Sequence, residues 1–133
     1  MKNLMVIIVV LLFSACSSDQ LEIGKAKKCA EGFLNTLKVN NFDEAEKYYS
    51  TDEFYSEATQ TRSEKIEELA TSIGKVISYS LTDSAFVELK GEPSAIYLTY
   101  KVENEKINST QIFIIQKEGS EYKIISQDVK AGE

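Results

Sequence analysis

Apolar residues recur every three or four positions in the first half of the chain, and this spacing is typical of amphipathic helices. Residues 21–39 carry a single apolar stripe, which predicts a helix with one face against a core. Residues 42–50 predict a second, short helix that begins after two asparagines, residues that suit helix ends. A third helical pattern covers residues 61–73 and ends at Gly74. The N-terminal half therefore predicts about three helices, and residues 50–60 are interpreted as a helical turn.

The spacing changes to alternation after Gly74, and alternation predicts half-buried strands. Five alternating segments follow, and a polar break at 82–84 separates the first two: residues 76–81, 85–89, 96–102, 107–117 and 122–129. Residues 112–115 are apolar on both faces, so we expect the strand that contains them to be central. Helices followed by an antiparallel meander of about four strands predict an α+β domain, with the helices packed on one face of the sheet.

The first 15 residues have a different character from the rest of the chain. Lys2 precedes an apolar run of ten residues, which as a helix would span roughly 15 Å, about half of a bilayer core. Such a run predicts the apolar part of a signal peptide, not a permanent span. The segment that follows it, Phe13-Ser14-Ala15-Cys16, resembles a bacterial lipobox, although Phe13 stands where leucine is usual.

The lipobox resemblance implies that Cys16 is acylated with palmitate-like chains and becomes the mature N-terminus. We therefore divide the chain into a signal peptide at 1–15, a lipidated cysteine and tether at 16–20, and a domain at 21–133. Two or more acyl chains hold a protein at a membrane. Ser17 favours the outer over the inner membrane, because aspartate at that position is the inner-membrane signal in enterobacteria. The alternative is a secretory signal whose cleavage site adjoins a cysteine by chance.

Composition excludes several classes of function. The 133 residues contain no histidine, so neither a Ser-His-Asp triad nor a histidine-liganded metal centre is available. The formal charge of −6 argues against nucleic-acid binding, which requires a basic face. No glycine-rich phosphate loop, EF-hand or CxxC pair occurs, so we expect neither cofactor nor metal. After loss of the signal peptide Cys29 is the only thiol besides Cys16, and we expect it to be a buried, inert residue.

Two stretches of sequence suggest a family. Residues 33–50, FLNTLKVNNFDEAEKYYS, resemble the first two helices of nuclear transport factor two-like domains, and residues 117–129, KEGSEYKIISQDV, resemble their last hairpin. The resemblance covers about residues 25–129 and implies a strongly curved, cone-like sheet around a long first helix, with a pocket at the open end. The family contains isomerases and dehydratases as well as non-catalytic modules, and a shared fold does not transfer an activity. Its catalytic pairs have no counterparts here residue by residue.

Three residues are candidates for lining such a pocket. Tyr79 and Tyr100 share strand parity with apolar neighbours, and tyrosine combines an apolar body with a polar tip. Asp128 is the isolated acid near the end of the last strand that would face the pocket mouth. The alternative is that both tyrosines are plain core residues whose hydroxyls reach solvent or a carbonyl. Three acidic doublets, Asp43-Glu44, Asp52-Glu53 and Glu67-Glu68, are expected at helix starts or on polar helix faces.

Two surface features have weaker signals. Asp83-Ser84-Ala85 matches the short acceptor motif of O-glycosylation in Bacteroidetes, so Ser84 is a candidate site in such a lineage. Three lysines at positions 25, 27 and 28 follow the proposed anchor closely and would contact anionic headgroups or form a solvated face.

Three functions remain open. The first is a membrane-anchored, non-catalytic envelope lipoprotein that binds a small molecule or a protein partner. The second is a cone-fold isomerase or dehydratase that works through Asp128 and a pocket tyrosine. The third is a dimerisation or scaffold module that uses the outer sheet face, where Ala95, Tyr97 and Thr99 would pack on a partner.

Overall fold

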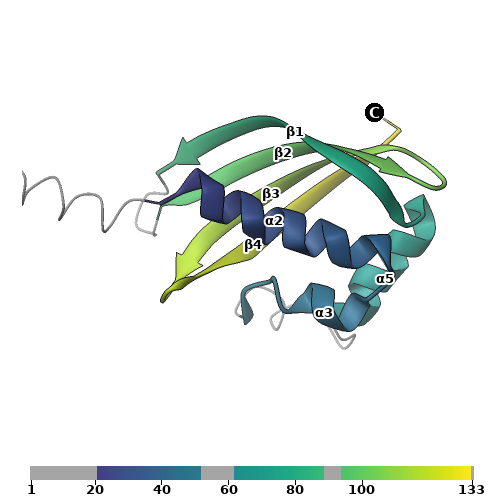
Figure 1. Cartoon of the computed structure of the whole chain (residues 1–133), viewed down its shortest axis with the longest axis horizontal. Helices are drawn as coiled ribbons and strands as arrows, with labels where there is room; N and C mark the ends of the chain where they lie inside the picture. Colours follow the sequence, from purple (N-terminus) through teal and green to yellow (C-terminus); the bar gives the residue numbers. More distant parts are fainter. Residues whose placement is uncertain (1–20, 52–61, 89–93, 133) are drawn as a thin grey trace, which may run out of the picture.

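The computed structural model describes residues 21–51, 62–88 and 94–132. Cys16 and the proposed signal peptide lie outside these ranges, as does nearly all of the helical turn expected at residues 50–60. The described chain forms three helices followed by a curved antiparallel sheet of four strands, as the sequence pattern predicted (Figure 1). No helix within the described ranges is both long enough and apolar enough to cross a bilayer.

The helices begin and end close to the predicted positions. They are α2 (Ile23–Lys38), α3 (Phe42–Glu46) and α5 (Arg62–Ile73). The predicted apolar stripe of α2 is buried along its length, at Ala26, Cys29, Ala30, Phe33, Leu34 and Leu37. The Asn41 side chain caps α3 by accepting a hydrogen bond from the Glu44 backbone N at 3.3 Å. α3 is shorter than predicted because the chain after it becomes extended at Tyr49, which forms a parallel bridge with Ile124.

The sheet is a simple meander in the order β1-β2-β3-β4. Its strands are β1 (Val76–Val87), β2 (Ala95–Asn104), β3 (Ser109–Glu118) and β4 (Glu121–Ala131). β3 is an interior strand, as its two apolar faces predicted. α2 lies across the concave side of the sheet, and α3 and α5 lie together towards one end of it (Figure 1). This side of the sheet and α2 enclose the core.

β1 differs from the sequence pattern, which showed two apolar segments with a polar break between them. The register against β2 shifts between Leu81 and Asp83, and this irregularity absorbs the polar residues without ending the strand. The Thr82 hydroxyl donates to the Thr99 carbonyl at 3.1 Å across the shift. Because of the shift, Ser84 and Phe86 lie on the same face of the sheet as Leu81.

Aromatic rings connect α2 to the centre of the sheet. Phe33 is 1% exposed, and its ring makes edge-on contacts with Tyr49 at 5.3 Å and with Phe113 at 5.7 Å between centroids. Tyr100 is fully buried and contacts Phe113 in the same manner at 5.9 Å. Such contacts add to the stabilisation that burial of the rings provides. The core therefore fixes α2 against the inner face of β2 and β3.

Candidate functional site

A row of polar side chains crosses the inner face of the sheet, where apolar residues would be expected. Asn104, Ser109 and Gln111 are between 1% and 5% exposed, and Gln127 and Tyr49 adjoin them from β4 and from the segment after α3. Isolated burial of amides and hydroxyls is unfavourable, so each group needs a partner. The partners here are one another.

The hydrogen bonds of this row run in one direction. The Tyr49 hydroxyl donates to Gln127 Oε1, and Gln127 Nε2 donates to Gln111 Oε1 at 2.8 Å. Gln111 Nε2 then donates to the Ser109 hydroxyl at 3.2 Å. Bonds aligned head to tail polarise one another, which strengthens the row. We call the five residues Tyr49, Gln127, Gln111, Ser109 and Asn104 the polar chain.

The polar chain ends at the backbone of the turn before β1. The Ser109 hydroxyl donates to Asn104 Oδ1 at 2.8 Å, and Asn104 Nδ2 donates to the Gly74 carbonyl at 3.2 Å. Gly74 has φ +89°, and a Cβ at this position would lie 2.6 Å from the Lys106 backbone N. Only glycine fits this close approach of two backbones. The Gly74 carbonyl, which is the last acceptor of the polar chain, is therefore held in a fixed position.

A small cavity lies between the polar chain and the helices. Its volume is about 20 Å³, enough for a single water molecule. Amides of the polar chain and apolar side chains of α2 and α5 line it: Asn104, Gln111, Gln127, Phe33, Leu37, Ile66, Leu69, Ala70 and Ile73. None of the described residues that line the cavity is ionisable. The described part of the wall therefore offers hydrogen-bond donors and acceptors but no group for proton transfer.

The two tyrosines predicted for the pocket lie together, beside the polar chain and not within it. Tyr79 and Tyr100 make an edge-on ring contact at 5.8 Å, and neither lines the small cavity. The Tyr100 hydroxyl donates to Glu31 Oε2 at 3.0 Å, and the Tyr79 hydroxyl donates to Asn35 Oδ1 at 2.9 Å. Both hydroxyls therefore bind polar side chains of α2.

Burial and the neighbouring carboxylate keep Tyr100 protonated. Desolvation raises the pKa of Tyr100 far above its usual value, and the hydrogen bond to Glu31 raises this pKa further. Desolvation also raises the pKa of Tyr79. Both side chains are donors of hydrogen bonds at neutral pH, with Glu31 as the carboxylate of this group. Strand alternation predicted that the two tyrosines share one face of the sheet. It did not predict that Glu31 lies beside them, because the position of a residue in a helix does not reveal which strand it faces.

Asp128 lies on the outer face of the sheet and is exposed, opposite Ile112 of β3. Counted from Tyr122 and Ile124, strand alternation would place Asp128 inside. The register of β3 with β4 shifts near Ile125, and the shift turns Gln127 inward and Asp128 outward. Asp128 does not meet Tyr79 or Tyr100, so the geometry offers no support for a reaction that needs these groups together.

Two other candidates have clear positions. Ser84 is exposed on β1, and its backbone N donates to Asp83 Oδ1 at 2.9 Å, so the Asp-Ser-Ala motif is accessible in a strand. Cys29 is buried, and burial raises the pKa of its thiol to about 12. The thiol is therefore protonated at neutral pH and unreactive. Among the described residues no group of acidic or cysteine side chains could hold a metal ion.

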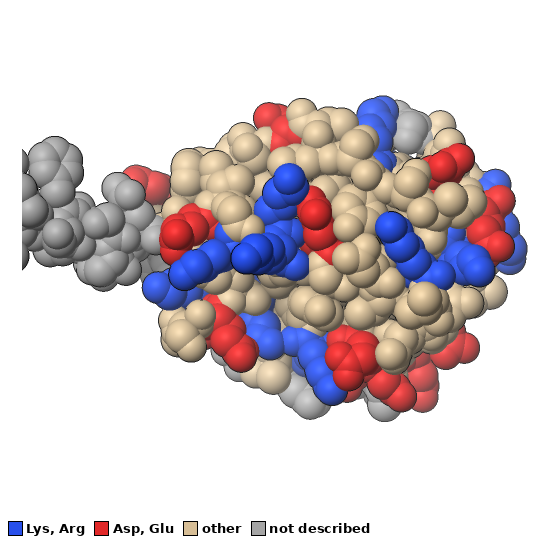
Figure 2. Space-filling model, in the orientation of Figure 1, with Lys and Arg blue, Asp and Glu red and all other residues tan. Residues whose placement is uncertain are grey.

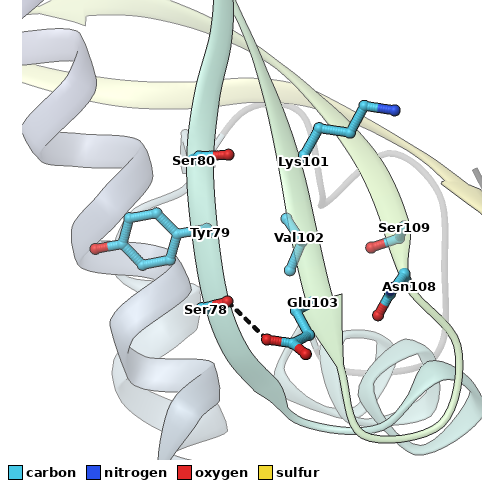
Figure 3. A pocket seen from close by; sticks show the side chains of 8 residues that line it. All are labelled: Ser78, Tyr79, Ser80, Lys101, Val102, Glu103, Asn108 and Ser109. Carbon is cyan, nitrogen blue, oxygen red and sulfur yellow. Dashed lines mark hydrogen bonds between the residues drawn. The ribbon is translucent and has the colours of Figure 1, made fainter.

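A shallow polar hollow of about 450 Å³ opens on the outer face of the sheet (Figure 3). Ser78 and Ser80 of β1 face Lys101 and Glu103 of β2 there, and the Ser78 hydroxyl donates to Glu103 Oε1 at 2.9 Å. The Tyr79 ring points away from this hollow towards α2 (Figure 3). Tyr79 and Ser109 also contribute to its lining, so the hollow adjoins both the tyrosine pair and the polar chain.

Comparison with known proteins supports the fold. No protein-family model and no curated protein sequence matches the chain. Among solved structures, the chain is similar to a nuclear transport factor two-like (NTF2-like) protein from Cytophaga hutchinsonii ATCC 33406, with a TM-score of 0.55 and 10% sequence identity. The match covers 84% of this chain and 99% of that one. The domain therefore has the NTF2-like cone fold that the sequence resemblance implied, and the likeness extends to the fold alone.

Proposed function

We propose that this chain is a lipid-anchored protein of the cell envelope whose cone domain is a non-catalytic binding module. The observation that supports the binding role is the polar chain, which places amides of Asn104, Gln111 and Gln127 beside a cavity with apolar walls. Ligand sites combine apolar walls with a few directed polar groups in this manner. The described wall carries no acid or base, which favours binding over catalysis.

The ligand of this site is a small neutral molecule with both donor and acceptor groups. Such a molecule replaces one link of the polar chain and satisfies the two groups that it separates. The cavity of about 20 Å³ has to enlarge to admit it. The buried side chains of α5, Ile66, Ala70 and Ile73, form the wall that gives way, because the strands opposite are paired with their neighbours.

Native mass spectrometry of the protein purified from its own host tests this role. We expect the wild type to carry a bound small molecule and the Gln111→Leu/Gln127→Leu variant to lose at least nine-tenths of it. Gln116→Leu is the control, since it makes one Gln→Leu change on the face of β3 opposite to Gln111. Circular dichroism verifies that each variant is folded. Equal occupancy in the three proteins, or none in the wild type, would contradict an interior site.

The outer face of the sheet supports a second candidate, self-association. Tyr97, Thr99, Ile112 and Ile114 form a half-buried, largely apolar centre on β2 and β3. Ala95 is fully buried, so Tyr97 and Thr99 remain as the predicted contacts on this face. A face of this kind suits contact with another protein surface.

Charged rows beside that centre favour a second copy of the same chain as the partner. Lys101 and Lys130 lie in one row of paired residues that runs across the strands. Asp83 and Asp128 lie in the next such row on the same face. All four are exposed, and none has an ion-pair partner in the described chain. A twofold axis that lies in the plane of the interface, parallel to these two rows and midway between them, would place the lysine row of one copy on the aspartate row of the other.

Charge reversal tests the homodimer. We expect Asp128→Lys and Lys130→Asp each to weaken dimerisation at least tenfold in analytical ultracentrifugation, because like charges would then face each other. The double variant Asp128→Lys/Lys130→Asp exchanges the signs and is expected to recover most of the affinity. A monomeric wild type at high concentration, or a double variant no better than the singles, would exclude this arrangement.

A further inference from the structure

Lysines gather over the N-terminal half of α2, beside the point where the described chain begins. Figure 2 shows this concentration of positive side chains on the face that α2 occupies. Lys25, Lys27 and Lys28 are all exposed. The chain as a whole has a formal charge of −6, so this face departs from the average. A local positive face on an acidic protein indicates contact with an anionic surface.

The lysines border an open groove between α2, α3 and the start of β4. The groove has a volume of about 500 Å³, and Lys25, Lys28, Lys47 and Lys123 line it together with Tyr48, the largely buried Tyr122 and the acidic residues Glu44 and Glu121. Lysine ammonium groups bind phosphate, and tyrosines are enriched where a protein meets the headgroup region of a bilayer. The groove thus combines the two side-chain types that favour a lipid surface.

The negative charges in the groove do not cancel its attraction for phosphate. Lys25 pairs with Glu22 at 2.9 Å, Lys47 pairs with Glu44 at 2.7 Å and Lys123 pairs with Glu121 at 3.3 Å, and the three carboxylates are exposed. Exposed pairs of this kind are weak and exchange readily with other partners. Lys28 has no ion-pair partner in the described chain. At least three lysines can therefore turn towards an anionic headgroup.

Chain length keeps the groove close to the proposed anchor. Leu21 is the fifth residue after Cys16, and five fully extended residues span roughly 18 Å. Lys25 and Lys28 follow within the first two turns of α2. We infer that this groove binds the headgroups of anionic phospholipids and seats the N-terminal end of α2 on the membrane. The orientation of the domain rests on the proposed anchor, whereas the affinity of the groove for lipid does not.

Sedimentation with vesicles tests the groove without the anchor. The chain from Ser17 onward is suitable because it contains every described residue of the hydrophobic core, including the partly buried Leu21 and Ile23 that pack against it. We expect it to bind vesicles of phosphatidylethanolamine with 30% phosphatidylglycerol and not vesicles of phosphatidylcholine alone. Lys28→Glu/Lys47→Glu is expected to lower the partition coefficient at least tenfold. The matched control, Lys75→Glu/Lys106→Glu, makes the same change in net charge at the far end of the sheet and should lower it less than twofold.

Two results would overturn the inference. One is the absence of binding to the anionic vesicles at 50 mM salt. The other is an equal loss of vesicle binding in the two double variants, which would indicate a response to net charge alone. Thermal melting of each variant verifies that it is folded. Because these proteins lack Cys16, the outcome is independent of acylation, and failure of the anchor itself is detected separately by labelling Cys16.

Discussion

Replacement of Cys16 by alanine is expected to abolish incorporation of labelled palmitate into the protein. Cys16 is the only cysteine at the end of the apolar run, and acylation there would supply the hydrocarbon that holds the domain at a membrane. We also expect alkaline carbonate to extract the variant from membranes, whereas the wild type stays with them. As a helix, the apolar run of residues 4–13 would span roughly half a bilayer core and would not substitute for acyl chains.

Cys29→Ala is the matched control for this experiment. Cys29 is the other cysteine of the chain, and it is 7% exposed in the helical core with a thiol that is protonated at neutral pH. Its replacement is expected to leave labelling and membrane retention unchanged. Full labelling of Cys16→Ala would refute the anchor, and so would loss of labelling in Cys29→Ala.

The arrangement of elements could be predicted from the sequence because it follows from periodicity. The stripe from Ala26 to Leu37 fixed the buried face of α2, and alternation fixed most of the strands. Parity also placed Tyr100 inside correctly, and it would have placed Gln111 inside as well, since Gln111 has the parity of Phe113 and Ile115. The signal for the polar chain was thus present on β3 but was masked by the apolar residues around it.

The rest of the polar chain depends on irregularities that periodicity does not reveal. One register shift turns Gln127 inward and Asp128 outward, and another takes β1 through a polar segment that suggested a break. The Tyr49 hydroxyl joins the polar chain because the segment after α3 becomes extended beside β4. These features depend on pairing between strands distant in sequence. A shift of one residue exchanges the two faces of a strand, so candidate site residues are the first to be misplaced.

The position of Phe33 makes the binding module and the stability of the fold depend on the same side chain. Phe33 contacts Tyr49, the first donor of the polar chain, and lines the small cavity. We expect Phe33→Ala to lower the free energy of unfolding by about 3–5 kcal/mol, because it leaves a void between α2 and the sheet. A domain of this size has a stability of roughly 5–15 kcal/mol, so a large part of it would be lost.

Urea unfolding measures the free energy of unfolding of Phe33→Ala, and Phe86→Ala is the matched control. Phe86 is 61% exposed at the end of β1, and its removal is expected to cost less than about 1 kcal/mol. Because the void frees the Tyr49 ring, Phe33→Ala should also weaken the hydrogen bond from Tyr49 to Gln127 and expose the amides of the polar chain. Similar losses of stability in the two variants would mean that α2 is not held by the ring contacts of Phe33, and the support for an interior site would fail with them.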